Sequence, residues 1–190
     1  MHDTHTPQLP AGIHANTTAV DPGYAVLVVV DPDTGALLMT KRAGHMRHHA
    51  GEICFPGGRI EDGETTLDAA LREAREELAL HPSHVHIGAL SVPAAYTATT
   101  YTTGKTFRVH YALLDPTLDA DAFIDTLQPN PDEVARVMWV DPKHCDATLM
   151  LNDTSSGLYR IHDTQHDEPI TGATADVCLA LWAHLGVTRH

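Results

Sequence analysis

The sequence predicts an α/β fold in which a mixed β-sheet has helices on both sides. Two segments, residues 66–80 and 171–185, carry apolar residues at helical spacing, and the second ends at Gly186. Apolar segments of strand length precede the first of these segments and lie between the two. This order of elements is typical of a sheet whose two faces are covered by helices.

The first two strands are predicted to form a hairpin. Residues 24–30 and 36–40 are apolar, and the Asp-Pro-Asp-Thr-Gly sequence between them is rich in turn-forming residues. A short strand is expected at Ile53, ahead of a Phe-Pro-Gly-Gly sequence. Further strands are expected at residues 85–92, 106–114 and 134–140, with a polar connection at 96–104 and a surface excursion at 116–130.

The first helix is predicted from strong helix formers that continue from Thr66 without glycine or proline until Pro82. Thr65 or Thr66 can supply the N-cap oxygen. Its buried stripe is predicted to consist of Leu67, Ala70, Leu71, Ala74 and Leu78. In the closing helix, Leu181 and Trp182 are expected in the core rather than at an oligomer contact.

Three glutamates of the first helix, Glu73, Glu76 and Glu77, are spaced to emerge together on a face beside that stripe and clear of it. Like charges at this spacing repel one another, so the cluster predicts a compensating cation. The simpler interpretation is a solvated acidic face with salt bridges to Arg72 and Arg75. The residues before the helix favour a cation: Mg²⁺ and Mn²⁺ prefer carboxylate and phosphate oxygens, and glycines upstream allow a close backbone approach.

The spacing of these residues matches a known family signature. Gly58, five residues, Glu64, seven residues and then Arg-Glu-Ala-Arg-Glu-Glu-Leu-Ala-Leu from Arg72 resembles the Nudix box. Proteins of this family are hydrolases of nucleoside diphosphates linked to another group. The resemblance implies the Nudix-type α/β/α sandwich with a mixed β-sheet. It departs at Ala79, where the family has a glycine, and this change affects the end of the helix rather than a ligand.

The resemblance also implies roles for matching residues. Glu73, Glu76 and Glu77 are expected to bind Mg²⁺ or Mn²⁺, with Glu76 or Glu77 also orienting or deprotonating the attacking water. Arg72 is expected to pair with Glu64 and fix the loop against the helix.

Residues outside the helix complete the predicted site. Gly57 and Gly58 are expected to shape the turn beside the metal and substrate. A further carboxylate is expected from Glu133, in a loop before a strand. The alternatives are a solvated turn residue, or Asp132 in its place.

A second motif lies upstream. Leu-Met-Thr-Lys-Arg-Ala from Leu38, then Arg47, Gly51 and Phe-Pro-Gly-Gly from Phe55 resemble the motif of the coenzyme A pyrophosphatases within the Nudix family. Met39 is the single, conservative departure. Coenzyme A carries a diphosphate and a 3′-phosphate, which arginine and lysine bind well. Lys41, Arg42 and Arg47 are therefore candidate substrate-binding residues, the alternative being an ordinary basic turn.

Composition limits the other classes of function. The chain has 190 residues, is 43% hydrophobic and carries a formal net charge of −13, which disfavours binding to nucleic acid or to an anionic membrane. We expect one domain over residues 23–190 after an extended segment at 1–22, and a homodimer is plausible for this family. Three widely separated cysteines and no apolar N-terminal run or membrane span predict a cytoplasmic protein without disulfides.

The fifteen histidines are the compositional oddity. His81, His84 and His86 cluster after the first helix, but they lack the spacing of a transition-metal site, and surface positions are favoured. His48 and His49 lie where contact with phosphate is possible. The tyrosines and hydroxyl side chains of residues 96–104 are possible contacts for adenine or pantetheine, the alternative being a surface loop.

The sequence thus predicts a metal-dependent hydrolase of coenzyme A or acyl-coenzyme A that yields 3′,5′-ADP and 4′-phosphopantetheine or its acyl form. One alternative is a hydrolase of ADP-ribose, NADH or an oxidised nucleoside triphosphate. Another, from a different class, is a Nudix-like module that senses such a ligand without cleaving it. The intact glutamates favour an enzyme.

Overall fold

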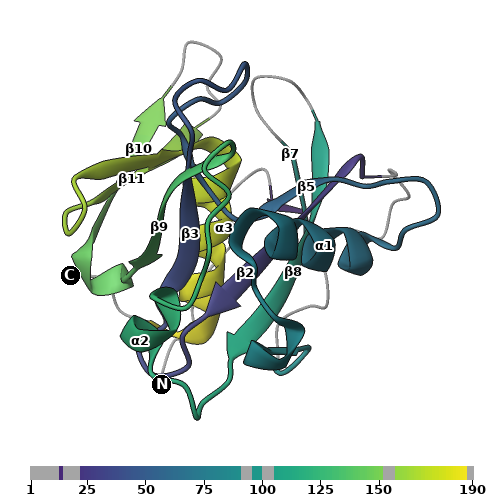
Figure 1. Cartoon of the computed structure of the whole chain (residues 1–190). Helices are drawn as coiled ribbons and strands as arrows, with labels where there is room; N and C mark the ends of the chain where they lie inside the picture. Colours follow the sequence, from purple (N-terminus) through teal and green to yellow (C-terminus); the bar gives the residue numbers. More distant parts are fainter. Residues whose placement is uncertain (1–12, 15–21, 91–95, 100–104, 152–156, 188–190) are drawn as a thin grey trace.

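The computed structural model describes residues 13–14, 22–90, 96–99, 105–151 and 157–187, and its centre is a large mixed sheet (Figure 1). Within these residues the sheet runs in the order β1-β7-β8-β2-β3-β4, with β5 and β6 added to β2 and β8, and β9 added to β3. The strands are β1 (Ile13–His14), β2 (Tyr24–Val30), β3 (Leu37–Arg42), β4 (Ile53–Cys54), β5 (Gly57–Arg59), β6 (Val85–Ile87), β7 (Tyr96–Thr99), β8 (Thr106–Leu114) and β9 (Val134–Val140).

Strands β2 and β8 pair in parallel, whereas the other pairs in this sheet are antiparallel. The predicted mixed sheet is confirmed. The predicted hairpin is also present, since β2 pairs with β3 through Val30 and Leu37. In its turn, Gly35 has a positive φ of 76°, and the Asp31 carboxylate accepts hydrogen bonds from the Asp33 amide and the Thr34 hydroxyl.

Helices cover both faces of the sheet, as the α/β/α prediction requires. Successive residues of a strand face opposite sides, so Leu27 and Val29 of β2 pack toward α1 (Thr66–Leu78) while Val28 and Val30 pack toward α3 (Gly172–Leu185). A short helix, α2 (Ala120–Ile124), adds Phe123 to the α1 side. Among the described helices, none combines the length and apolar character needed to cross a lipid bilayer.

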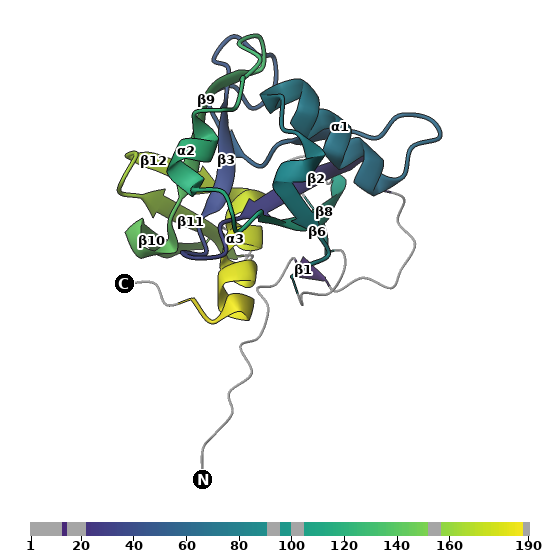
Figure 2. The ribbon, with the colours of Figure 1, turned by 60° about the horizontal axis from the view of Figure 1, so that its bottom comes forward.

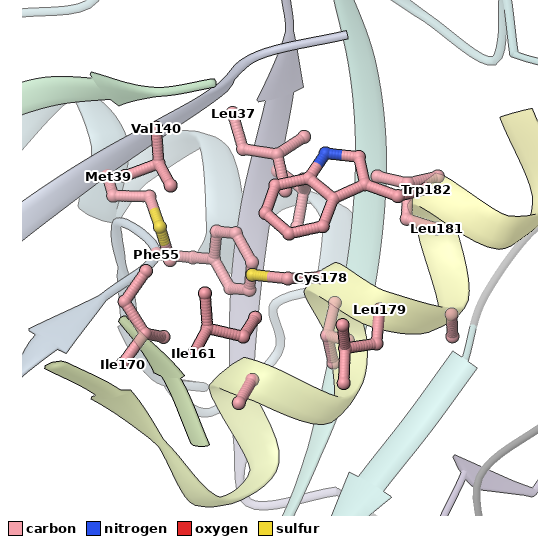
Figure 3. Close-up of a cluster of buried hydrophobic side chains, with 14 of the residues drawn as sticks. Leu37, Met39, Phe55, Val140, Ile161, Ile170, Cys178, Leu179, Leu181 and Trp182 are labelled. Carbon is pink, nitrogen blue, oxygen red and sulfur yellow. The ribbon is translucent and has the colours of Figure 1, made fainter. Parts of the chain in front are cut away.

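The larger core lies between the sheet and α3. Figure 3 shows Trp182 and Cys178 of α3 facing Leu37, Met39 and Phe55. Trp182 is fully buried, and its indole Nε1 donates to the carbonyl oxygen of Gly35 at 3.0 Å. The predicted core position of Trp182 is confirmed, and Leu181 beside it is also buried.

A second sheet covers the other side of α3 and has no counterpart in the sequence prediction. It contains β10 (Cys145–Leu151), β11 (Gly157–Asp163) and β12 (Glu168–Thr171), all antiparallel (Figures 1 and 2). Ile161 and Ile170 on its inner face join the core of α3. The chain therefore buries α3 between two sheets.

Several predicted boundaries need correction. The strand predicted at 85–92 ends at Ile87, because Gly88 follows with a positive φ of 74°, and residues 91–92 lie outside the described part. The connection predicted at 96–104 begins with strand β7; residues 100–104, and hence its predicted ligand contacts there, lie outside the described residues. In the predicted N-terminal segment, Ile13 and His14 form β1.

Candidate active site

The helix that carries the predicted metal ligands, α1, is capped at both ends. At its start Thr65 and Asp68 form a capping box: the Thr65 hydroxyl accepts from the Asp68 amide at 3.1 Å, and the Asp68 carboxylate accepts from the Thr65 amide. At its end Ala79 adopts the left-handed conformation, with φ 54° and ψ 28°. Glycine takes this conformation readily, whereas alanine is strained in it.

The strain at Ala79 leads to a stability prediction. Ala79→Gly is expected to raise the free energy of unfolding by about 1 kcal/mol, because it removes the left-handed penalty of a side chain that lies exposed. Gly186, which ends α3 at φ 66° and has open space where a methyl group would lie, provides the matched reverse substitution. Gly186→Ala should lower stability by a similar amount in urea unfolding; a loss of stability in Ala79→Gly would contradict the interpretation.

Glu77 differs from the prediction, because its side chain is buried rather than clear of the apolar stripe. Only 3% of the residue is exposed, while Leu67 and Leu71 of the predicted stripe are half-buried. The Glu77 Oε2 atom accepts a hydrogen bond from the Gly57 amide at 3.1 Å. Burial is the main reason that the pKa of Glu77 rises to about 8, and the negative charge of Glu73 contributes to the same effect.

Arg72 connects the loop before the helix to its acidic face. Its Nε and Nη2 atoms donate to the two carboxylate oxygens of Glu64 at 2.8 and 3.1 Å, which is the predicted contact, and Nη2 also donates to the carbonyl oxygen of Arg59. Its Nη1 atom donates to one oxygen each of Glu73 and Glu76 at 3.0 and 3.1 Å. The hydrogen bond from Arg72 lowers the pKa of Glu64.

The two glycines lie in strand β5 and bring backbone against α1. At Gly57, φ is +154° and an added Cβ would lie 2.4 Å from the carbonyl oxygen of Ala25, so a side chain would break the contact of β5 with β2. At Gly58, an added Cβ would lie 2.4 Å from the carboxyl carbon of Glu73. The Glu73 carboxylate therefore lies directly against Gly58, in the space that the side chain of any larger residue at position 58 would need.

This close approach predicts a sharp effect of Gly58→Ala. The new methyl group must displace the Glu73 carboxylate, so we expect metal-dependent activity to fall by about 10- to 100-fold, the usual cost of misplacing a group at a metal site. Gly44→Ala is the control, since nothing lies within 4 Å of its added Cβ and its φ is ordinary. Full activity in Gly58→Ala would show that Glu73 has no fixed position.

The donor set fits a hard divalent cation. Glu73, Glu76 and Glu77 each accept the hydrogen bonds described above through a single oxygen, so a second oxygen of each remains for an ion. Within the described residues the side chains do not already converge as a ready three-ligand group. Arg72 Nη1 bridges Glu73 and Glu76 instead. The fit rests on the carboxylate chemistry and on the space left by Gly58.

Glu133 and Arg42 lie beside these carboxylates. Glu133 is half-buried before β9, and its negative charge contributes to raising the pKa values of Glu73 and Glu77, for which burial is the main cause. The positive charge of Arg42 lowers the pKa of Glu77, and Arg42 Nε is buried without a hydrogen-bond partner among the described residues. Asp132, the competing carboxylate, is exposed.

Lys41 does not join this group. Neighbouring residues of a strand face opposite sides, and Lys41 lies on the α3 side of the sheet, where its Nζ atom pairs with Glu168 of β12 at 2.5 Å. Arg136 of β9 shares the same carboxylate at 3.3 Å. The sequence reasoning missed Glu168 because it treated Lys41 and Arg42 as a single basic cluster. Lys41 instead connects the two sheets.

The remaining predicted residues lie in the loop between β3 and β4. Arg47, His48 and His49 are exposed there, and His49 Nδ1 contacts the Glu52 carboxylate at 2.9 Å. The loop is closed by two backbone hydrogen bonds between Arg42 and residues 51 and 52. All three cysteines are free thiols. Cys54 is half-buried beside Thr40.

A comparison with protein families identifies this arrangement. A model of the NUDIX domain matches residues 21–160, which is most of the chain and includes α1, β5 and the Glu133 loop. The chain belongs to the Nudix family. Its acidic helix and Gly58 belong to the segment that resembles the Nudix box.

Curated relatives match a shorter stretch. Nudix hydrolase 3 of Caenorhabditis elegans is 51% identical over 61 residues, which cover 32% of this chain and 25% of that protein. An uncharacterized Nudix hydrolase NudL of Escherichia fergusonii is 49% identical over 61 residues, covering 32% of this chain and 31% of the relative. These matches span a quarter to a third of the relatives' length.

Solved Nudix structures share the fold over a longer range. RenU, a Nudix hydrolase from M. smegmatis, aligns with a TM-score of 0.54 and 22% identity over 87% of this chain and 86% of its own. A MutT/nudix family protein from Enterococcus faecalis aligns with a TM-score of 0.51 and 14% identity, over 96% of this chain and 66% of its own. Both support the mixed α/β fold of this Nudix chain.

Proposed function

We propose that this protein is a metal-dependent hydrolase that cleaves the diphosphate of coenzyme A or an acyl derivative. The products are 3′,5′-ADP and 4′-phosphopantetheine, or its acyl form. The observation that supports the hydrolase proposal is the acidic face of α1, where Arg72 bridges Glu73 and Glu76, Glu73 lies against Gly58 and Glu77 accepts from Gly57. The coenzyme A proposal rests on the motif that runs from Leu38 to Gly58.

The roles of the protein groups follow from their positions. A divalent ion, Mg²⁺ or Mn²⁺, supplies positive charge that stabilises the phosphate oxygens and lowers the pKa of the attacking water. Glu73, Glu76 and Glu77 hold this ion, and Arg72 keeps Glu73 and Glu76 in place. Glu133, which is half-buried at the edge of the cluster, takes the proton of the water.

Positive charge for the substrate comes from the end of β3 and from the β3–β4 loop. Arg42 faces the carboxylates, and Arg47 is exposed in the loop that follows it. Arginine binds phosphate through two parallel hydrogen bonds, so these two side chains suit the diphosphate and the 3′-phosphate. Lys41 is left out of this proposal because Glu168 already neutralises it.

A substrate panel tests the proposal. The purified protein is incubated with Mg²⁺ or Mn²⁺ and coenzyme A, acetyl-coenzyme A, ADP-ribose, NADH or nucleoside triphosphates, and products are identified by mass. We expect 3′,5′-ADP from coenzyme A or its acetyl derivative at the highest rate. Preferred cleavage of ADP-ribose or NADH would reject the coenzyme A assignment, and binding without any cleavage would indicate a sensor.

A variant at Arg47 tests the basic loop. Arg47→Ala should raise KM for coenzyme A by about 10-fold, the equivalent of one lost charge-assisted hydrogen bond, and change kcat little. The same variant should bind dephospho-coenzyme A no worse than the unmodified protein if Arg47 contacts the 3′-phosphate. Arg160→Ala on the exposed face of β11 is the control. An unchanged KM in Arg47→Ala would refute the contact.

Three further assignments belong to the same proposal. The free cysteines suit a reducing compartment, so we propose that the protein acts in the cytoplasm on a small-molecule substrate. The net charge of −13 disfavours nucleic acid as a partner. A homodimer remains a prediction, which sedimentation tests by measuring the mass of the protein in solution.

A further inference from the structure

The loop before β9 is fastened to the last turn of α1. The Asn130 amide donates to the Glu77 carbonyl oxygen at 2.8 Å, and the Gln128 amide donates to the Leu78 carbonyl oxygen at 2.9 Å. Carbonyl groups in the last turn of a helix have no partner within the helix. The loop therefore caps α1 immediately beside its buried glutamate, and its position relative to Glu77 is fixed through backbone groups.

Asn130 is the centre of this loop. Its carbonyl oxygen accepts hydrogen bonds from the amides of Glu133 and Val134 at 3.0 and 2.8 Å. Its side-chain Oδ1 accepts from the Asp132 amide at 3.2 Å, which closes a turn of the kind that asparagine favours. Asn130 is half-buried, whereas Asp132 is exposed.

Glu133 is held from its other side as well. Its carbonyl oxygen accepts from the Ala43 amide at 2.8 Å, at the start of the β3–β4 loop. The backbone of Glu133 is thus fixed to Asn130 on one side and to the end of β3 on the other. Through Asn130, whose amide donates to the Glu77 carbonyl oxygen, the backbone of Glu133 is tied to the last turn of α1.

We propose that Asn130 is a positioning residue: by closing the turn before Glu133 and bonding to the Glu77 carbonyl, it holds the Glu133 carboxylate against the acidic face of α1. This inference rests on the proposed function, since Glu133 is the group that takes the proton. Asn130 acts only through the position that it gives to Glu133.

The test is a double-mutant cycle on the full-length protein with saturating Mg²⁺ and the best substrate of the panel. Asn130→Ala removes the side-chain acceptor and leaves the backbone hydrogen bonds possible. We expect kcat to fall about 10-fold with KM nearly unchanged. Glu133→Gln should reduce kcat more strongly. In that background Asn130→Ala should change kcat by less than about 2-fold, because residues that act as a unit are not additive.

A matched control separates positioning from stability. Asp141 closes a similar turn at the opposite end of β9, where its Oδ1 accepts from the Lys143 amide at 2.8 Å. Asp141→Ala should lower the melting temperature about as much as Asn130→Ala does, yet leave kcat unchanged. If Asn130→Ala melts below the assay temperature, Asn130→Ser enters the same cycle.

The outcomes distinguish the two levels of the proposal. The role of Asn130 is overturned if the losses of kcat multiply in the double variant, or if Asp141→Ala loses as much kcat as Asn130→Ala. In either case the proposed function is upheld if the unmodified protein is active. An unmodified protein that cleaves no substrate of the panel overturns the proposed function and this inference together.

Discussion

Glu77→Gln is expected to lower metal-dependent kcat/KM by at least about 100-fold and, without metal, to stabilise the protein above pH 8. The first effect follows from loss of an anionic ligand. The second follows from burial: a carboxylate that must ionise where only 3% of its residue is exposed costs free energy. Glutamine keeps the oxygen that accepts from Gly57 without carrying the charge.

The pH dependence has a definite sign. The folded pKa of Glu77, about 8, lies above the ordinary value of 4.5, so between these values the folded state binds the extra proton. The stability that protonated Glu77 contributes to the metal-free protein is therefore fully present below pH 4.5 and is lost as pH rises through 8, by a few kcal/mol in order of magnitude. Urea unfolding from pH 5 to 9 in EDTA measures this slope.

Glu76→Gln is the matched control for Glu77→Gln. The Glu76 side chain is 54% exposed, so its replacement should reduce turnover strongly while the buried carboxyl group of Glu77 stays in place. Equal pH slopes in Glu77→Gln and the unmodified protein would contradict the buried, uncompensated charge. Near-normal turnover in Glu76→Gln would refute its assignment as a ligand.

Arg72→Lys should be nearly as damaging as removal of the side chain. The guanidinium makes five hydrogen bonds, two of them to the paired oxygens of Glu64, and the side chain is only 17% exposed. A lysine ammonium has three donors at a single point and cannot reproduce this geometry. We expect about 2–4 kcal/mol of lost stability and a 10- to 100-fold loss of activity.

Arg75→Lys tests whether this effect is specific. Arg75 lies on the same helix but is exposed, so the same chemical change should alter stability by less than about 0.5 kcal/mol and leave activity intact. Glu64→Gln should reproduce part of the Arg72→Lys defect, since it removes the charge of the principal partner. Equal effects at Arg72 and Arg75 would mean that the loop and helix are not joined through Arg72.

The acidic helix could be read from sequence because its determinants are local. Helix formers without glycine or proline from Thr66 onward and the spacing of three glutamates sufficed to predict α1. The burial of Glu77 could not be read in this way. It depends on β5, which lies 20 residues upstream of Glu77 and packs its glycines against that side of the helix.

The parts that sequence reasoning missed are set by distant contacts. Lys41 and Arg42 are neighbours in sequence, yet the alternation of β3 sends one to Glu168 and the other toward Glu77. The second sheet was missed because β10–β12 mix polar and apolar residues and gain their burial from α3. The assignment of Glu133 as a further carboxylate of the site stays a prediction, and the role proposed for Asn130 depends on backbone hydrogen bonds that no side-chain pattern reveals.

The most direct test of the central claim is a crystal structure with Mn²⁺ and coenzyme A, with anomalous scattering used to locate the ion. We expect an ion about 2.0–2.3 Å from carboxylate oxygens of Glu73, Glu76 and Glu77, with Arg72 still holding the other oxygens of Glu73 and Glu76. An anomalous map with no peak at these three glutamates, in a crystal where substrate is bound, would contradict it.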